Sequence, residues 1–187
     1  MNAKSNAELI LEALDERLDT RIELTLYGRA ALHLGFAQGP PEFAFSADID
    51  AVLWVGQAQE LADRSNFWEA VEEINLKLAK DGLYASHFFE ETQVILRPSW
   101  KGDRAKIEGP WSRLSLFRLG NIDLLLSKLM RDDPQDLRDA MFIVRSARLD
   151  NATINKAISE ARVPPLLELR EQFAICCEKL RRQLEVS

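Results

Sequence analysis

The pattern of polar and apolar positions divides the chain into a first part that mixes strands with helices and a second part that is helical throughout. Residues 21–27 alternate polar and apolar side chains up to Gly28, which is typical of a half-buried strand. Residues 51–55 form a continuous apolar run suited to a strand buried on both faces. Further short strands are expected at residues 83–84, 87–89, 93–96 and 114–117.

Apolar residues at helical spacing predict the remaining elements. Between Gln59 and Lys80 the pattern fits either one long helix or two helices broken near Ser65. Pro134 suits the first turn of a helix, where a missing amide hydrogen costs nothing. The expected helices span residues 7–18, 29–34, 59–80, 122–130, 134–147, 152–162 and 165–184.

These elements predict an α/β (α+β) fold in which a small mixed β-sheet is flanked by helices. We expect residues 1–120 to form this core and residues 121–187 to form a helical extension packed on it. A length of 187 residues suits one domain with a modest appendage.

Composition and charge exclude several classes of protein. The chain lacks the run of about 18 apolar residues that a membrane span requires. Acidic residues interrupt the N-terminal stretch, whereas a signal peptide needs an apolar segment, so we expect a cytoplasmic protein. The net charge of −6 and the pI near 5.1 disfavour nonspecific binding to nucleic acid.

The cysteines and histidines do not suggest a zinc site. Cys176 and Cys177 are adjacent, and neighbours rarely reach disulfide geometry, so both are expected to be reduced. His33 and His87 are too scattered to complete a zinc-ligand pattern with them. We expect His33 to lie among apolar helix residues and His87 to begin a short strand, each in a structural role.

Two acidic residues flank Ile49 at the start of an expected strand. Because side chains alternate along a strand, Asp48 and Asp50 must project from the same face. Paired carboxylates repel unless a cation such as Mg²⁺ neutralises them. In the alternative interpretation, Asp48 caps a loop and Asp50 faces solvent.

The second signal is Gly28, where an expected strand gives way to a helix. A helix N-terminus presents amide groups and a partial positive charge, which favour phosphate binding where the backbone is accessible. The alternative is an ordinary turn glycine.

Together, Gly28-Arg29 and Asp48-Ile49-Asp50 resemble the DNA polymerase beta-like nucleotidyltransferase superfamily, which combines a glycine turn opening a helix with an Asp-x-Asp strand. Residues 123–131 and 136–140 resemble, more narrowly, the uncharacterised bacterial branch related to AbiEii-type toxins. The resemblance covers residues 24–144. It implies a nucleotidyltransferase-like mixed sheet followed by helices.

The resemblance implies transfer of a nucleotidyl group from an NTP to an acceptor such as RNA, a protein or a small molecule. Asp48 and Asp50 would be the catalytic residues and the Mg²⁺ ligands, and Gly28 and Arg29 would hold the phosphates. Lys128 and Arg131 lie three apart on an expected helix and would also contact the phosphates or the acceptor. In the alternative, both belong to an ion-pair network with Asp123, Asp136 and Asp139 that fixes the helical tail on the sheet.

This chain departs from the family pattern at two places. Arg29 replaces the usual second glycine or serine, and the usual third carboxylate lacks a clear counterpart. Glu91 and Asp103 are the candidates for that third acid. The alternative function is therefore a catalytically inactive binding or regulatory protein, such as one component of a toxin–antitoxin system with a small antitoxin partner. The oligomeric state is left open.

Overall fold

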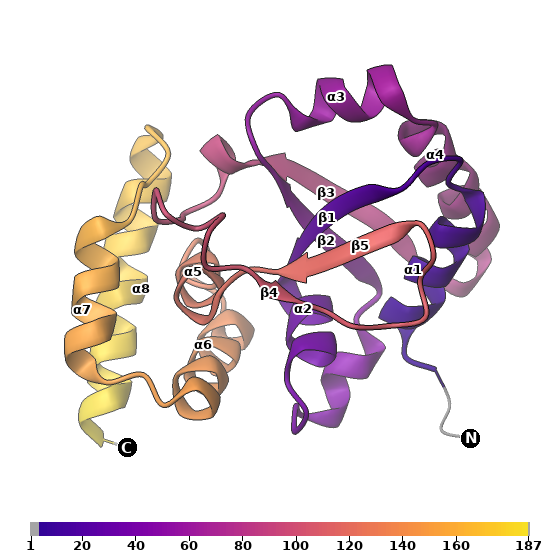
Figure 1. Cartoon of the computed structure of the whole chain (residues 1–187). Helices are drawn as coiled ribbons and strands as arrows, with labels where there is room; N and C mark the ends of the chain where they lie inside the picture. The colour runs from indigo at the N-terminus through magenta and orange to yellow at the C-terminus, as the bar shows by residue number, and fades with distance from the viewer. Residues whose placement is uncertain (1–3, 187) are drawn as a thin grey trace. The chain divides into compact units, whose positions relative to one another are not determined.

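A computed structural model describes residues 4–186 and shows a five-stranded mixed β-sheet accompanied by α-helices (Figure 1). The expected fold class is confirmed. Residues 1–3 and 187, which the expected domains included, lie outside the described residues. The strands are β1 (Ile22–Tyr27), β2 (Asp48–Leu53), β3 (Tyr84–Glu90), β4 (Ala105–Lys106) and β5 (Leu114–Arg118). The α-helices are α1 (Asn6–Arg17), α2 (Gly28–Gly35), α3 (Gln57–Arg64), α4 (Phe67–Leu78), α5 (Asn121–Ser127), α6 (Pro134–Ala147), α7 (Asn151–Glu160) and α8 (Leu167–Val186). Short 3-10 helices are η1 (Pro41–Phe45), η2 (Ala79–Asp81) and η3 (Glu91–Gln93).

The chain forms two compact units. The first takes in the described residues up to Glu90 together with 105–118, and it holds the whole sheet and helices α1 to α4. The second takes in residues 91–104 and the described residues from Leu119 onward, with helices α5 to α8. Within the described residues, no helix is long and apolar enough to cross a membrane.

In the first unit the strand order is β3-β2-β1-β5-β4. β1 pairs antiparallel with β2 and parallel with β5, while β2 pairs parallel with β3. Helices α1 and α4 contact each other, and α4 covers the sheet face on which the ring of Phe88 meets the ring of Phe67, with centroids 5.2 Å apart (Figure 1). Leu26 and Ala51 pair across β1 and β2 and are fully buried. Hydrophobic burial on this face fixes which way every β2 side chain points.

Local signals in the sequence explain where several of these elements begin and end. Ser5 and Glu8 form a capping box at α1, because the Ser5 hydroxyl accepts from the Glu8 amide and the Glu8 carboxylate accepts from the Ser5 amide. The region 59–80 forms two helices, interrupted at Ser65 and Asn66, which was one of the two expectations. Asp133 caps α6, which begins at Pro134 as predicted.

One expected strand is wrong. Val94, Ile95 and Leu96 are buried and Gln93 is exposed, but this run forms no strand; among the described residues its one bridge joins Leu96 to Arg162 within the second unit. An apolar run indicates burial, and these residues are buried in a unit whose regular elements are helices, without belonging to a sheet. The short strand β4 was not expected.

The helix expected over 122–130 is also too long. α5 ends at Ser127, and Lys128 is the cap residue whose amide donates to the carbonyls of Leu125 and Leu126. The spacing predicted that Lys128 and Arg131 share a helix face. This prediction is wrong, because both residues follow the end of α5. Within the second unit, α5 contacts α6 and α7, and α6 contacts α8.

Candidate functional site

β2 places its two acidic residues on the sheet face opposite α4. Ala51 lies on the α4 face with its partner Phe88, so Asp50 and Asp48 project from the other face, because β-strand side chains alternate. The side chain of Asp50 is 20% exposed. Ser46 donates a hydrogen bond of 3.1 Å from its Oγ to Oδ1 of Asp48, which restrains that carboxylate. The predicted carboxylate pair is present at the start of β2.

Gly28 brings the N-terminus of α2 against this pair. Tyr27 is paired with Asp50 across β1 and β2, so the residue that follows it begins α2 beside the Asp50 carboxylate. Gly28 has φ +72°, which favours glycine, and a Cβ on it would lie 2.6 Å from Oδ2 of Asp50. The positive φ favours glycine, and any side chain at this position would have to displace the Asp50 carboxylate. The structure therefore brings together the two sequence signals, the glycine turn and the Asp-x-Asp strand.

A bulge in β3 adds a third group that the sequence analysis assigned to a structural role. Ile49 pairs with Ala85 and Ala51 pairs with Phe88, so β3 carries one residue more than β2 over the same length. His87 lies in this bulge with φ +55°, in the left-handed region. The extra residue turns His87 to the face that carries Asp50.

The resulting cluster has the donor set of a cation site. One ligand atom from each of Asp48, Asp50 and His87 lies within 4.8 Å of the other two, and this is the only such trio found among residues 4–186. His87 Nδ1 lies 2.9 Å from Oδ1 of Asp50 and 3.2 Å from Oγ of Ser86. These distances allow the three donors to converge on one ion. Two carboxylates and one imidazole are ligands that divalent cations accept, so the residues fit a bound divalent cation.

Arg29, expected to hold phosphates, stands at the first turn of α2. Its guanidinium lies 5.4 Å from the ring centroid of Phe43, a buried residue of η1. This cation–π contact directs the long side chain onto η1. α2 has no side-chain cap hydrogen bond at its N-terminus, and its first residue, Gly28, is buried.

Lys128 and Arg131 belong to the second unit and are paired with acids there. The ammonium of Lys128 is 3.0 Å from Asp136 and 2.8 Å from Asp139, and all three side chains are buried. Arg131 contacts Asp136 at 2.9 Å through a side chain that is 73% exposed. These contacts match the alternative interpretation for Asp136 and Asp139, whereas Asp123 pairs with Arg97 at 2.6 Å instead.

The two candidates for a third carboxylate also have partners in the second unit. Glu91 Oε2 accepts hydrogen bonds from Trp100 Nε1 at 2.7 Å and from Arg162 at 2.8 Å. Asp103 forms an ion pair with Arg97 at 2.8 Å. Glu91 thus ties the 91–104 segment to Arg162, whereas Asp103 pairs with Arg97 inside that segment.

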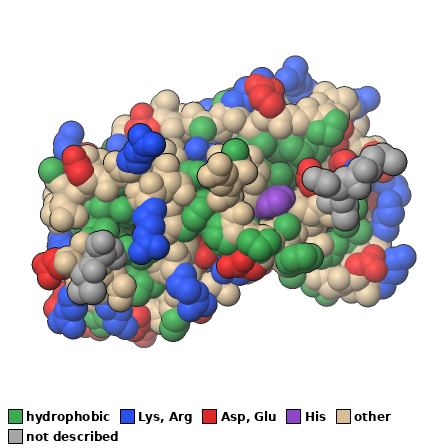
Figure 2. All heavy atoms as spheres, turned by 90° about the horizontal axis from the view of Figure 1, so that it is seen from below, with side chains coloured by type: hydrophobic (Ala, Val, Ile, Leu, Met, Phe, Trp, Pro, Cys, Tyr) green, Lys and Arg blue, Asp and Glu red, His purple; other side chains and the backbone are tan. Residues whose placement is uncertain are grey.

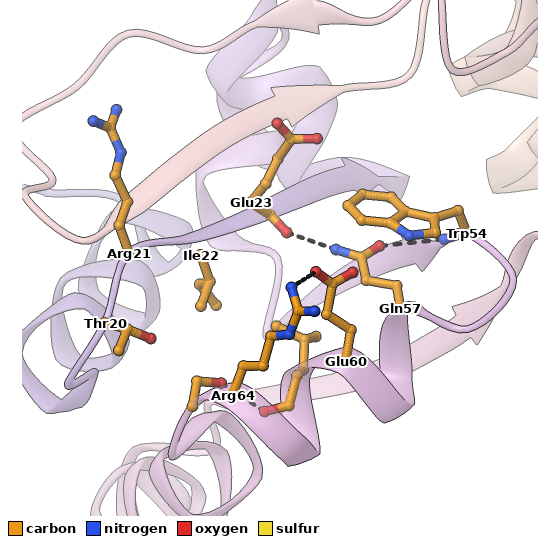
Figure 3. A pocket seen from close by; sticks show the side chains of 10 residues that line it. Thr20, Arg21, Ile22, Glu23, Trp54, Gln57, Glu60 and Arg64 are labelled. Carbon is orange, nitrogen blue, oxygen red and sulfur yellow. Dashed lines mark hydrogen bonds and ion pairs between the residues drawn. The ribbon is translucent and has the colours of Figure 1, made fainter.

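The first unit also contains a pocket of about 360 Å³ near the start of β1 and the end of β2 (Figure 3). Its polar groups are largely satisfied by one another. Gln57 donates to the carbonyl of Glu23 at 2.8 Å and accepts from the amide of Trp54, while Arg64 pairs with Glu60. The pocket lies at the opposite end of β1 from Gly28 and is separate from the carboxylate cluster.

In the part of the chain that the structure describes, the two cysteines do not form a second reactive centre. Cys176 and Cys177 are free and buried, and burial raises the pKa of Cys177 to about 12, which makes its thiol a poor nucleophile. Basic and acidic side chains are interspersed over the face seen in Figure 2 rather than gathered into a basic stripe. That distribution agrees with the acidic net charge.

Comparisons of this chain with protein-family models, with curated proteins and with solved structures gave no match.

Proposed function

We propose that this chain is a nucleotidyltransferase-like protein that transfers a nucleotidyl group from an NTP to an acceptor hydroxyl or phosphate. Asp48 and Asp50 hold the divalent cation, which is Mg²⁺ in the family that the sequence resembles. The N-terminus of α2, at Gly28 and Arg29, receives the outer phosphates. The nature of the acceptor, RNA, protein or small molecule, is left to experiment.

The observation that carries the proposal is the convergence of the glycine turn with the Asp-x-Asp strand. These segments are 20 residues apart in sequence, and the β1–β2 pairing places Gly28 directly against Asp50. A helix N-terminus beside two carboxylates suits a triphosphate and its cation, because the amides attract the anion and the acids attract the metal.

The roles of the residues follow from this arrangement. Asp48 and Asp50 orient the cation, and Ser46 holds the Asp48 carboxylate in place. When bound, the divalent ion supplies charge neutralisation on the phosphates and stabilises an in-line displacement at phosphorus. In that displacement an acceptor oxygen bonds to the α-phosphorus and pyrophosphate leaves. The ion pairs of Lys128 explain that residue without a ligand, so the proposal rests on the first unit.

Label transfer tests this function. The full chain is incubated with α-³²P-labelled or γ-³²P-labelled NTPs, a divalent cation, and total RNA or protein as acceptor. We expect the α-label and not the γ-label to appear on an acceptor, because nucleotidyl transfer retains only the α-phosphate. Asp48→Asn should abolish labelling, whereas Asp63→Asn, an exposed acid on α3, should leave it unchanged. Equal labelling by wild type and Asp48→Asn would contradict the proposal.

A second candidate is a catalytically inactive protein of the same fold that binds nucleotide, for example as a component of a toxin–antitoxin system. It is favoured by one observation: the third group beside Asp48 and Asp50 is His87 rather than a carboxylate. Cation-dependent nucleotide binding without transfer to any acceptor, and co-purification with a small partner, would select this candidate.

A further inference from the structure

We infer that His87 is the third ligand of the cation site and that it makes the site selective for a first-row transition cation, with Mn²⁺ as the test ion, over Mg²⁺. This inference rests on the cation site of the proposed function. It adds the identity of the ion, and it assigns a role to His87, which is not part of the family pattern.

Geometry places the imidazole in the site. The ligand atoms of Asp48, Asp50 and His87 lie within 4.8 Å of one another, and they come from adjacent strands β2 and β3. The separation of 2.9 Å between His87 Nδ1 and Asp50 Oδ1 shows that the ring faces the carboxylate. A single ion could therefore be reached by two oxygens and one nitrogen.

The backbone of His87 adopts an unfavourable conformation in this placement. His87 adopts φ +55° within the bulge, a conformation that costs a residue with a Cβ free energy. The side chain is 55% exposed, so burial of the ring returns little of that cost. Its closest aromatic neighbour is Phe89, with ring centroids 5.5 Å apart in a tilted arrangement. Strained residues of this kind cluster at ligand sites, where the strain aims a functional group.

Donor chemistry then selects the class of ion. Mg²⁺ is a hard cation that takes oxygen ligands and keeps several waters, so an imidazole nitrogen adds little to its binding. First-row transition ions accept imidazole readily, and Mn²⁺ also accepts carboxylates and water. The replacement of a third carboxylate by His87 thus leaves two oxygens that either ion can use and one nitrogen that only the transition ion uses well.

The test uses the full, metal-free chain with Mn²⁺ or Mg²⁺ alone, without nucleotide and in a buffer free of imidazole. Electron paramagnetic resonance measures Mn²⁺ affinity and the coupling of Mn²⁺ to imidazole ¹⁴N, and competition measures Mg²⁺ affinity. The chain has only two histidines, so His33→Ala is a matched control for His87→Ala.

In wild type and in His33→Ala we expect ¹⁴N coupling and tighter binding of Mn²⁺ than of Mg²⁺. His87→Ala should abolish the coupling and weaken Mn²⁺ binding at least about tenfold, since losing even an outer-sphere partner of a ligand costs about 10- to 100-fold. Mg²⁺ affinity should change much less. His87→Asp should bind cation without ¹⁴N coupling and with its preference shifted toward Mg²⁺, which also tests the inference if His87→Ala does not fold.

Retention of ¹⁴N coupling or of wild-type Mn²⁺ affinity in His87→Ala would overturn this inference and leave the carboxylate site in place. Mn²⁺ binding that is unaffected by Asp48→Asn would overturn both the inference and the cation site of the proposed function. A protein that shows the expected Mn²⁺ signature but binds no NTP would support the inference and contradict the proposed function, so the two failures are distinguishable.

Discussion

Oδ2 of Asp50 lies 2.6 Å from the point at which a Cβ on Gly28 would be placed. The contact follows from two features of the backbone: the pairing of Tyr27 with Asp50 across β1 and β2, and the left-handed φ of +72° at Gly28 that opens α2. A residue with a side chain would have to displace the carboxylate and adopt a strained conformation. Gly28 therefore controls the position of the Asp50 carboxylate.

Alanine at position 28 would both strain the backbone and displace the Asp50 carboxylate, and a matched variant separates these two effects. We expect Gly28→Ala to lower the free energy of unfolding and to abolish cation binding, because the new methyl group displaces Asp50. Gly82→Ala is the control, since Gly82 has a similar φ of +68° but nothing within 4 Å of its Cβ position. Each substitution costs about 1 kcal/mol of backbone strain. Denaturant unfolding and Mn²⁺ titration of both variants provide the measurement, and equal cation affinities would contradict the expectation.

Strain at His87 gives a second prediction, in which removing the side chain weakens Mn²⁺ binding while glycine at this position relieves backbone strain. His87→Gly should be about 1 kcal/mol more stable than His87→Ala, because glycine adopts φ +55° without a Cβ penalty. Both variants should bind Mn²⁺ more weakly than wild type. Arg148 has φ +53° at the end of α6, so the pair Arg148→Gly and Arg148→Ala should show the same stability difference without any change in cation affinity.

Lys128 should matter for folding. Lys128→Met leaves Asp136 and Asp139 buried without their shared cation, and breaking a buried pair in this way costs about 3–5 kcal/mol. Arg131→Met removes an exposed side chain from the same acid and should cost no more than about 1 kcal/mol. Urea unfolding at neutral pH measures both. Similar losses in the two variants would contradict the assignment of Lys128 to the buried network.

Asp15 should make stability depend on pH. Burial raises the pKa of Asp15, but hydrogen bonds from the amides of Ser112, Arg113 and Leu114 outweigh it and leave the pKa below its ordinary value. A lowered pKa in the folded state means that the ionised form stabilises the fold. That stabilisation is complete above the ordinary carboxyl pKa of about 3.9 and is lost as the pH falls through the lowered value.

Asp15→Asn should therefore be less stable than wild type at neutral pH, and the difference should shrink as the pH falls from ~5 toward ~1. Unfolding curves over this range provide the measurement. Glu16→Gln, an exposed neighbour on α1, is the control and should show no such convergence. A difference between Asp15→Asn and wild type that stays constant with pH would contradict the role given to the carboxylate.

The fold could be predicted from the sequence where local signals dominate. Pro134 with Asp133 sets the start of α6, and the alternation over 21–27 with Gly28 sets β1 and its end. The run at 93–96 misled the analysis because burial and strand formation are different properties: Leu96 is buried in a unit whose other elements are helices. α5 ends at Ser127 instead of residue 130. Lys128 forms ion pairs with Asp136 and Asp139 of α6, which are tertiary contacts that helical spacing cannot predict.

The candidate site could be predicted only in part, for a related reason. The geometry of Asp48 and Asp50 follows from the period of a strand, and the helix after Gly28 follows from the turn. The position of His87 depends on the register between β2 and β3, which a bulge shifts by one residue. Without the bulge His87 would point to the other face, so no signal in the sequence alone could have placed it beside Asp50.

The central claim is that Asp48 and Asp50 form a cation-dependent nucleotide site, and calorimetric titration tests it most directly. ATP, GTP, CTP and UTP are titrated into wild type, the double variant Asp48→Asn/Asp50→Asn, and a charge-matched control, Asp63→Asn/Asp81→Asn, each with and without Mg²⁺ or Mn²⁺. We predict that wild type and the control bind at least one NTP only when the cation is present, and that the double variant does not. Cation-dependent binding of equal strength in the double variant, or its absence from wild type, would contradict the claim.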